Sequence, residues 1–250
     1  MREIRIYSQA PLTANAVIEL HADAARHVGQ VLRMQPGQGL VMFDGTGGSY
    51  PAVIHKVSNR MLSVATGTLL PEERESPVNL SLWHGLCRGE RMDSVIQKAT
   101  ELGADTIRPL LTERSMVKLD QRRAKKKLDH WQKTVISACE QCGRNRLPKI
   151  EAPKRLHDLL DRVGEFDLAL ILDPQASTGL TDALASHAAA VKVLICTGPE
   201  GGFTDEEVAL ATQAGMLNVH AGPRVLRTET APLAAISIVQ ALLGDLRNNR

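Results

Sequence analysis

From residue 78 onward, short apolar runs alternate with helical segments, and this pattern constrains the fold more than any other feature of the chain. The runs are unbroken, which is typical of strands in a parallel sheet that helices cover on both faces. Strands are expected at 78–86, 106–111, 168–172, 193–196 and 217–220, and helices at 91–102, 122–142, 156–163, 180–190, 205–214 and 231–247. The fold class is therefore α/β with a mostly parallel sheet.

The first seventy residues have a different pattern, which indicates a small β-rich module. Strands are expected at 17–20, 40–43, 50–57 and 60–70, and a helix at 22–33. The segment 71–77 is charged, is flanked by prolines and contains no apolar residue, so it marks a domain boundary. We therefore divide the chain into domains 1–72 and 73–250.

Basic residues are concentrated in the middle of the chain. Residues 85–150 carry 15 basic and 8 acidic side chains, a net charge of +7, whereas 1–84 are neutral and 151–250 carry −5. This asymmetry suggests a polyanionic partner, although a solvated helix face explains the basic run 122–127 equally well. Aromatic residues make up only 3% of the chain, so an RNA interaction cannot rest on rows of stacking rings.

Composition also limits the compartment. No apolar run approaches the roughly 18–20 residues of a membrane span, and the chain opens without the apolar segment of a signal peptide. Four cysteines in 250 residues do not form a disulfide framework, so a reducing cytoplasm fits. Cys139 and Cys142 have CxxC spacing, but they lie inside an expected helix without a second pair, and Cys142 is expected in the core.

Three expected strands end in unusual loops, at 173–175, 197–202 and 221–231. Ligands of open parallel sheets bind beyond the carboxyl ends of the strands. In the second loop, Gly198, Gly201 and Gly202 allow close backbone approach and positive φ. This loop lacks the phosphate-binding motifs GxxxxGK[ST] and GxGxxG. Glu200 and the acidic run 205–207 would also repel a phosphate, so a neutral or cationic ligand is favoured. The alternative is a tight turn without a ligand.

The ends of the second and third loops carry further signals. Thr204 and Glu207 have the spacing of a capping box, which predicts a firmly fixed helix start. In the third loop, the polar residues Arg224, Arg227, Thr228, Glu229 and Thr230 lie between two apolar segments. They indicate a functional site, or alternatively a cap of the last helix by Thr228 or Thr230.

Together these segments resemble the RsmE family of SPOUT-class methyltransferases, which methylate N3 of a uridine in small-subunit (16S) ribosomal RNA. The matching segments are Arg26-His27, Val31-Leu32-Arg33, Pro36-Gly37, 97–103, 112–115, Trp131, 138–142, Arg144, 198–203 and 224–231. The last two segments are the most specific.

The resemblance implies an N-terminal PUA-like β-barrel that binds RNA, a C-terminal domain with a trefoil knot, S-adenosylmethionine as cofactor, and a homodimer. The resemblance implies neither a metal ion nor a membrane partner. It places the donor in the loops at the sheet edge, held largely by backbone groups. The candidate donor-binding residues are Leu172, Thr197, Gly198, Glu200, Gly201, Gly202, Gly222, Leu226, Thr228 and Ala231.

Methylation of N3 requires loss of its proton, which is weakly acidic, so the enzyme must stabilise the uridine anion, supply a base, or do both. We expect Arg227 to stabilise the charge on a uracil oxygen, and Glu229 or Glu200 to act as the base. The candidate RNA contacts are Arg33, Arg88, Arg91, Lys98, Arg114, Arg122, Arg123, Lys125, Lys126, Lys127 and Arg144.

Two other functions fit parts of the pattern. A non-catalytic RNA-binding or ribosome-assembly protein explains the basic region but leaves the glycine loop unexplained. A dinucleotide-dependent oxidoreductase fits a parallel sheet, and the missing GxGxxG argues against it.

Overall fold

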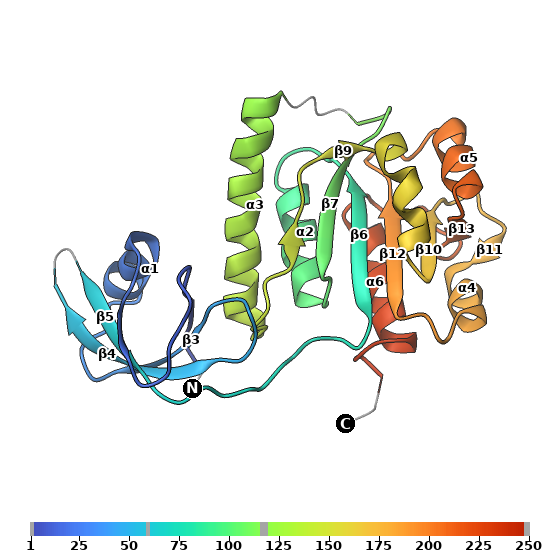
Figure 1. Ribbon diagram of the computed structural model, residues 1–250. Coiled ribbons are helices and arrows are strands. Elements are labelled where there is room, and N and C mark those ends of the chain that lie inside the picture. The colour runs from blue at the N-terminus through green and yellow to red at the C-terminus, as the bar shows by residue number, and fades with distance from the viewer. Residues whose placement is uncertain (1–2, 59–60, 116–119, 248–250) are drawn as a thin grey trace. The chain divides into compact units, whose positions relative to one another are not determined.

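A computed structural model describes residues 3–58, 61–115 and 120–247 (Figure 1). The chain separates into two compact units. The first comprises Met1–Glu75 together with Cys139–Leu147, and the second comprises Ser76–Ala138 together with Pro148–Arg250. The sequence-based division at residues 72 and 73, with its knotted second domain, stays a prediction.

The first unit is built on a five-stranded mixed sheet, as the strand-rich pattern predicts. Its order is β1-β3-β4-β5-β2, with β1 parallel to β3 and the other pairs antiparallel. Ala52 and Ile54 of β4 are buried while their neighbours are exposed, so one face packs on the core. The strands are β1 (Arg5–Tyr7), β2 (Val17–Glu19), β3 (Gly39–Phe43), β4 (Tyr50–Val57) and β5 (Leu62–Thr66).

The helix expected at 22–33 is shorter and irregular. Only α1 (Ala22–Arg26) is α-helical, and the next turn, η1 (His27–Val31), has the wider π-helical geometry. Arg33 has φ +53°, a left-handed conformation that cannot continue a right-handed helix. The strand expected at 60–70 is observed only as β5, and residue 60 lies outside the described residues.

The second unit contains the predicted parallel sheet. Its strand order is β11-β13-β10-β12-β6-β7-β8, with β9 also paired to β7, and all of these pairs are parallel. The strands are β6 (Asn79–Gly85), β7 (Thr106–Leu111), β8 (Lys149–Ile150), β9 (Lys154–Arg155), β10 (Leu168–Leu172), β11 (Thr178–Gly179), β12 (Lys192–Thr197) and β13 (Leu217–His220).

Helices cover both faces of this sheet, which confirms the α/β fold class (Figure 1). On one face, Leu194 and Cys196 of β12 share a buried cluster with Leu159 and Ala211, which come from the helices η2 and α5. The intervening residues of β12 point to the opposite face, where α6 packs against the strand and against α2 and α4. The helices are α2 (Arg91–Glu101), α3 (Gln121–Cys142), the 3₁₀ helix η2 (Leu156–Glu165), α4 (Leu180–Ser186), α5 (Asp205–Gln213) and α6 (Thr230–Leu242).

Some helices end where the sequence predicts, and others end earlier. Gly103 and Gly143 have φ +85° and +90° directly after α2 and α3, as expected of left-handed caps. The helices expected at 180–190 and 231–247 end earlier, at Ser186 and Leu242. In the last helix, Gly244 follows two residues later, where glycine weakens helical continuation. Within the described residues, no helix is long and apolar enough to span a membrane.

The start of α5 has the predicted capping box. The Glu207 backbone N–H donates to Thr204 Oγ1 at 3.1 Å, and the Thr204 N–H donates to Glu207 Oε2 at 2.9 Å. The second oxygen of Glu207 also accepts from the Glu113 N–H at 3.0 Å. These bonds fix the point where the loop after β12 enters α5.

We predict that Thr204→Ala lowers the free energy of unfolding by about 1 kcal/mol, because it removes the oxygen that caps the helix. Thr212→Ala is the matched control: Thr212 is exposed, and its hydroxyl donates to the Val208 carbonyl of the same helix. We expect this control to change stability by less than about 0.5 kcal/mol. Urea denaturation of both variants measures the difference, and equal losses would contradict the role of the cap.

Candidate functional site

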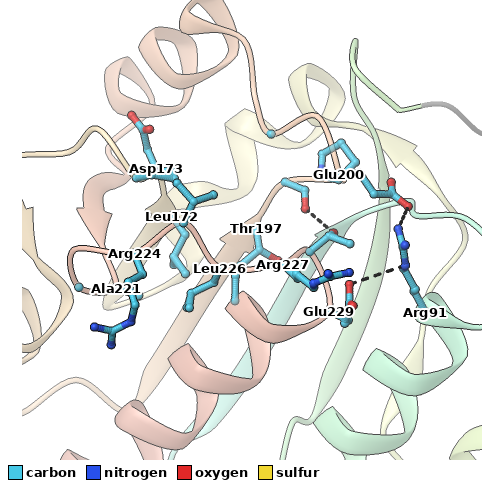
Figure 2. A pocket seen from close by; sticks show the side chains of 18 residues that line it. Arg91, Leu172, Asp173, Thr197, Glu200, Ala221, Arg224, Leu226, Arg227 and Glu229 are labelled. Atoms are coloured by element: carbon cyan, nitrogen blue, oxygen red, sulfur yellow. Dashed lines mark hydrogen bonds and ion pairs between the residues drawn. The ribbon is translucent and has the colours of Figure 1, made fainter.

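The three unusual loops come together at the carboxyl edge of the parallel sheet. They follow β10, β12 and β13, and they enclose a pocket of about 390 Å³ (Figure 2). This volume lies in the usual range for small-molecule and cofactor sites. The pocket is lined by Arg91, Leu172, Asp173, Pro174, Thr197, Gly198, Pro199, Glu200, Gly202, Ala221, Gly222, Arg224, Val225, Leu226, Arg227, Thr228, Glu229 and Ala231.

Close backbone packing shapes the loop after β12. A Cβ added at Gly85, the last residue of β6, would overlap the backbone nitrogen of Pro199, so only glycine lets the loop cross there. A Cβ at Gly198 would lie 3.0 Å from the backbone of Gly202. Gly202 itself has φ +67°. The loop therefore depends on glycine for close approach at two positions and for a left-handed backbone at a third.

Gly201 differs from its neighbours and does not line the pocket. A Cβ there would lie 3.0 Å from Cβ of Arg114, and Gly201 is not among the residues with positive φ. The expectation that this glycine approaches a ligand directly is therefore not supported by its position. Its place is on the side of the loop that Arg114 covers.

Two side chains tie the loop after β12 to other segments. The Arg114 guanidinium donates to the carbonyls of Gly201, at 3.1 Å, and Phe203, at 2.9 Å. The Thr228 hydroxyl donates to the Gly198 carbonyl at 3.1 Å. Arg114, expected to contact RNA, thus holds the loop, and Thr228, for which a helix cap was the alternative, joins two walls of the pocket.

Both candidate carboxylates are paired with one arginine. Arg91 Nη1 lies 3.0 Å from Glu200 Oε1, and Arg91 Nε lies 3.9 Å from Glu229 Oε2 (Figure 2). Glu200 also accepts the Arg88 backbone N–H at 3.0 Å. Burial raises the pKa of Glu200, but the bonds from Arg88 and Arg91 outweigh it and leave that pKa below its usual range. Both contacts therefore stabilise the charged form of Glu200.

The two arginines of the third loop have no such partner. Among the described residues, neither Arg224 nor Arg227 forms a side-chain hydrogen bond or ion pair, and both side chains are exposed at the pocket. Figure 2 shows Arg227 near Glu229, whereas Arg224 lies apart from them on the side of Ala221. Both guanidinium groups are therefore available to a ligand or substrate at the pocket.

The structure brings most of the candidate site residues together. Arg227, Glu229 and Glu200 line the pocket, as do all of the candidate donor-binding residues except Gly201. Their roles stay predictions. These residues come from β10, β12, the loops after β12 and β13, and the first turn of α6, and they are up to about sixty residues apart in the sequence.

The candidate RNA contacts are scattered. Arg33 is exposed in the first unit, and Arg88 is exposed after β6. Arg122, Arg123, Lys125 and Lys126 are exposed in the first turns of α3, while Lys127 is half-buried. Lys98 is paired with Glu101 at 2.8 Å. Arg144 is only 4% exposed and forms an ion pair with Glu75, so its predicted contact with a phosphate does not fit its position.

The prediction that Cys142 of the CxxC pair lies in the core is wrong. Cys139 is fully buried, whereas Cys142 is only partly buried, so the core residue is Cys139. None of the four cysteines forms a disulfide. No group of three or more His, Cys, Asp or Glu residues within 3–58, 61–115 and 120–247 is arranged to hold a metal ion.

The contribution of β6 to this site was not predicted from the sequence. Gly85 makes room for Pro199, and His84 bonds to Thr197 with Nδ1 and Oγ1 2.7 Å apart. The sequence offered one signal, because a histidine and a glycine follow the apolar residues Leu82 and Trp83 at the end of an expected strand.

Comparisons with known proteins identify the family. A family model described as an RNA methyltransferase domain matches residues 74–240, and one described as an RNA methyltransferase PUA domain matches residues 20–64. The curated ribosomal RNA small subunit methyltransferase E of Buchnera aphidicola is 34% identical over 97% of both chains. The protein of the same name from Bacillus subtilis is 33% identical, over 89% of this chain and 91% of the relative.

Comparison with solved structures points to the same family. A methyltransferase from Legionella pneumophila, in complex with the cofactor SAM, is 41% identical with a TM-score of 0.93, over 98% of this chain and 100% of that one. Ribosomal RNA small subunit methyltransferase E from Neisseria gonorrhoeae, bound to S-adenosyl methionine, is 34% identical with a TM-score of 0.90 over the same shares. The chain therefore belongs to the ribosomal RNA small subunit methyltransferase E family.

Proposed function

We propose that this enzyme transfers a methyl group from S-adenosylmethionine to N3 of a uridine in small-subunit ribosomal RNA. The pocket at the carboxyl edge of the sheet is the observation that carries the proposal. Its wall combines exposed backbone with the carboxylates of Glu200 and Glu229, which suits a ligand that is cationic and has no phosphate. The binding of SAM by the similar Legionella and Neisseria proteins supports the same assignment.

The residues of the pocket fit this cofactor. Gly202 and Gly222 have positive φ, and a Cβ at either would meet no protein atom within 4 Å, so both leave space beside the backbone. Leu172, Leu226 and Ala231 supply apolar surface. Bound S-adenosylmethionine supplies a methyl group made electrophilic by its sulfonium. The protein would hold that group in line with N3 of the uridine, and such positioning accounts for a large share of many enzymatic rates.

Arg227 is the best candidate to stabilise the uridine anion. Its guanidinium is at the pocket and has no partner among the described residues, so it is available to a uracil oxygen as N3 loses its proton. Arg91 is less available, because it is already paired with both carboxylates.

Glu229 is the better candidate for the base. Its oxygen is 3.9 Å from Arg91, whereas Glu200 is held at 3.0 Å by both Arg91 and the Arg88 N–H. A carboxylate whose charged form is strongly hydrogen-bonded accepts a proton less readily. Glu200 therefore positions the loop and Arg91, and Glu229 takes the N3 proton.

The basic start of α3 fits the RNA backbone. Arg122, Lys125 and Lys126 are exposed, and none of them forms an ion pair with another described residue. The PUA domain supplies a second RNA-binding module, as its family description suggests.

We further propose that the catalytic domain is knotted, that the enzyme is a homodimer, and that it acts in the cytoplasm on ribosomal RNA or on the small subunit. A non-catalytic assembly protein would leave the pocket without a role.

We predict that the protein binds S-adenosylmethionine and does not bind NAD, and that Gly222→Val weakens donor binding at least tenfold. A valine at φ +92° strains the loop and fills space beside the ligand. Gly37→Val is the matched control, because Gly37 has φ +87° and equally open surroundings in the first unit. Calorimetric titration measures both affinities. An equal affinity in the two variants would place the donor elsewhere.

We predict that Arg227→Lys lowers single-turnover methyl transfer by roughly 10²–10³, with little change in donor or RNA affinity. Lysine keeps the charge but loses the planar fork. Raising the pH should partly rescue this variant, because more uridine is then already deprotonated. Arg224→Lys, on the other side of the pocket, is the control and should show neither effect. Weaker RNA binding with unchanged turnover at saturation would make Arg227 a phosphate contact instead.

We predict that replacing both Lys125 and Lys126 by glutamine weakens RNA binding and flattens its salt dependence. Each lost phosphate contact should reduce the slope of log affinity against log salt by about 0.9 for a duplex or about 0.7 for a single strand. The control replaces Lys154 and Lys192, which are also exposed, and removes the same charge. Equal slopes in the two double variants would show that the basic turn of α3 is only solvated.

A further inference from the structure

A buried histidine lies directly behind the pocket wall. His84, near the end of β6, is fully buried, and the sheet register places it opposite Thr197 at the end of β12. Its Nδ1 is 2.7 Å from Thr197 Oγ1, and its Nε2 is 3.7 Å from Cys87 Sγ. Thr197 lines the pocket, so the histidine reaches the site only through this threonine.

The ring is neutral at physiological pH. Burial lowers the pKa of His84 to about 4, against a smaller opposing effect of Glu200. Burial also raises the pKa of Cys87 to about 12, so the sulfur carries its proton. His84 therefore has one N–H donor and one bare nitrogen, and the two neighbours decide which nitrogen is which.

The contacts favour the proton on Nδ1. In that tautomer, Nδ1–H donates to the threonine oxygen and Nε2 can accept from the Cys87 thiol. In the other tautomer, a buried Nε2–H would face sulfur, which is a weak acceptor. With Nδ1 as the donor, the hydroxyl hydrogen of Thr197 is not used by His84.

We propose that His84 is a positioning residue that holds the Thr197 hydroxyl as a hydrogen-bond donor at the pocket wall, where it bonds to an acceptor atom of the bound methyl donor. This proposal rests on the assignment of the pocket to S-adenosylmethionine. It adds a function for two buried polar groups, His84 and Cys87, that the transfer reaction itself does not use.

Calorimetric titration with S-adenosylmethionine tests the hydroxyl. Thr197→Val keeps the shape of the side chain but removes its hydroxyl. It should weaken binding of S-adenosylmethionine roughly 5- to 10-fold, the effect of one hydrogen bond. Thr197→Ser should restore binding to within about twofold of wild type. Thr100→Val is the control: Thr100 is a buried threonine outside the pocket whose hydroxyl bonds to the Ile96 carbonyl, and its replacement should leave affinity unchanged.

A double-mutant cycle tests the histidine. His84→Leu should weaken binding, and Thr197→Val should then add little, because the hydroxyl is no longer held. His84→Gln, whose amide can still donate to Thr197, should bind more tightly than His84→Leu. If His84→Leu does not fold, the cycle is run with His84→Gln, where the loss caused by Thr197→Val should be retained.

Nitrogen-15 NMR of the wild-type protein reports the tautomer directly, and the buried histidine should carry its proton on Nδ1. A proton on Nε2, additive losses in the cycle with His84→Leu, or unchanged affinity of Thr197→Val would each overturn the proposal while wild-type binding of the donor stands. Failure of the wild-type protein to bind S-adenosylmethionine would instead overturn the proposed function, and this inference with it.

Discussion

The close approach of two backbone segments, the end of β6 and the loop after β12, is the constraint on which the rest of the site depends. Gly85 has no side chain where Pro199 crosses, and Gly198 has none where the loop folds back on Gly202. A Cβ at Gly85 would push the loop away from the sheet edge. The tether from Thr228 to the Gly198 carbonyl and the bonds from Arg114 then fix the loop from both sides. Backbone packing and hydrogen bonds to backbone carbonyls thus shape the pocket.

Among the charged groups of the pocket, Glu200 and Glu229 are paired with Arg91, whereas Arg224 and Arg227 have no partner among the described residues. Arg91 joins Glu200 to Glu229 and thereby links the loop after β12 to the loop before α6. Arg227 remains without a partner among the residues that the structure describes. A site that must stabilise a developing anion benefits from a cation that is not already neutralised, because a preformed ion pair would first have to break. In the proposed function, Arg91 and Glu200 shape the pocket, whereas Arg227 and Glu229 act on the substrate.

Much of the fold could be predicted from local signals in the sequence, and the family resemblance pointed to most of the residues that line the pocket. Apolar runs identified β10 and β12 and, with polar interruptions, β6, β7 and β13, and the capping-box spacing of Thr204 and Glu207 predicted the start of α5. What the sequence did not reveal depends on contacts between distant segments. The burial of Arg144 against Glu75, the cover of Arg114 over Gly201 and the bond from His84 to Thr197 each join residues whose proximity no spacing shows. For the same reason, the sequence does not distinguish Arg114 and Arg144, which make structural contacts, from the exposed basic residues of α3.

The identity of the methylated atom tests the central claim most directly. Small-subunit ribosomal RNA that lacks the modification is incubated with the enzyme and methyl-labelled S-adenosylmethionine, digested to nucleosides and analysed by mass spectrometry. A site that stabilises a deprotonated uracil predicts label in N3-methyluridine, at a rate that falls when Arg227 is replaced. Label on carbon 5 of the base, on a ribose hydroxyl or on another base, or no transfer at all with the intact enzyme, would contradict the account.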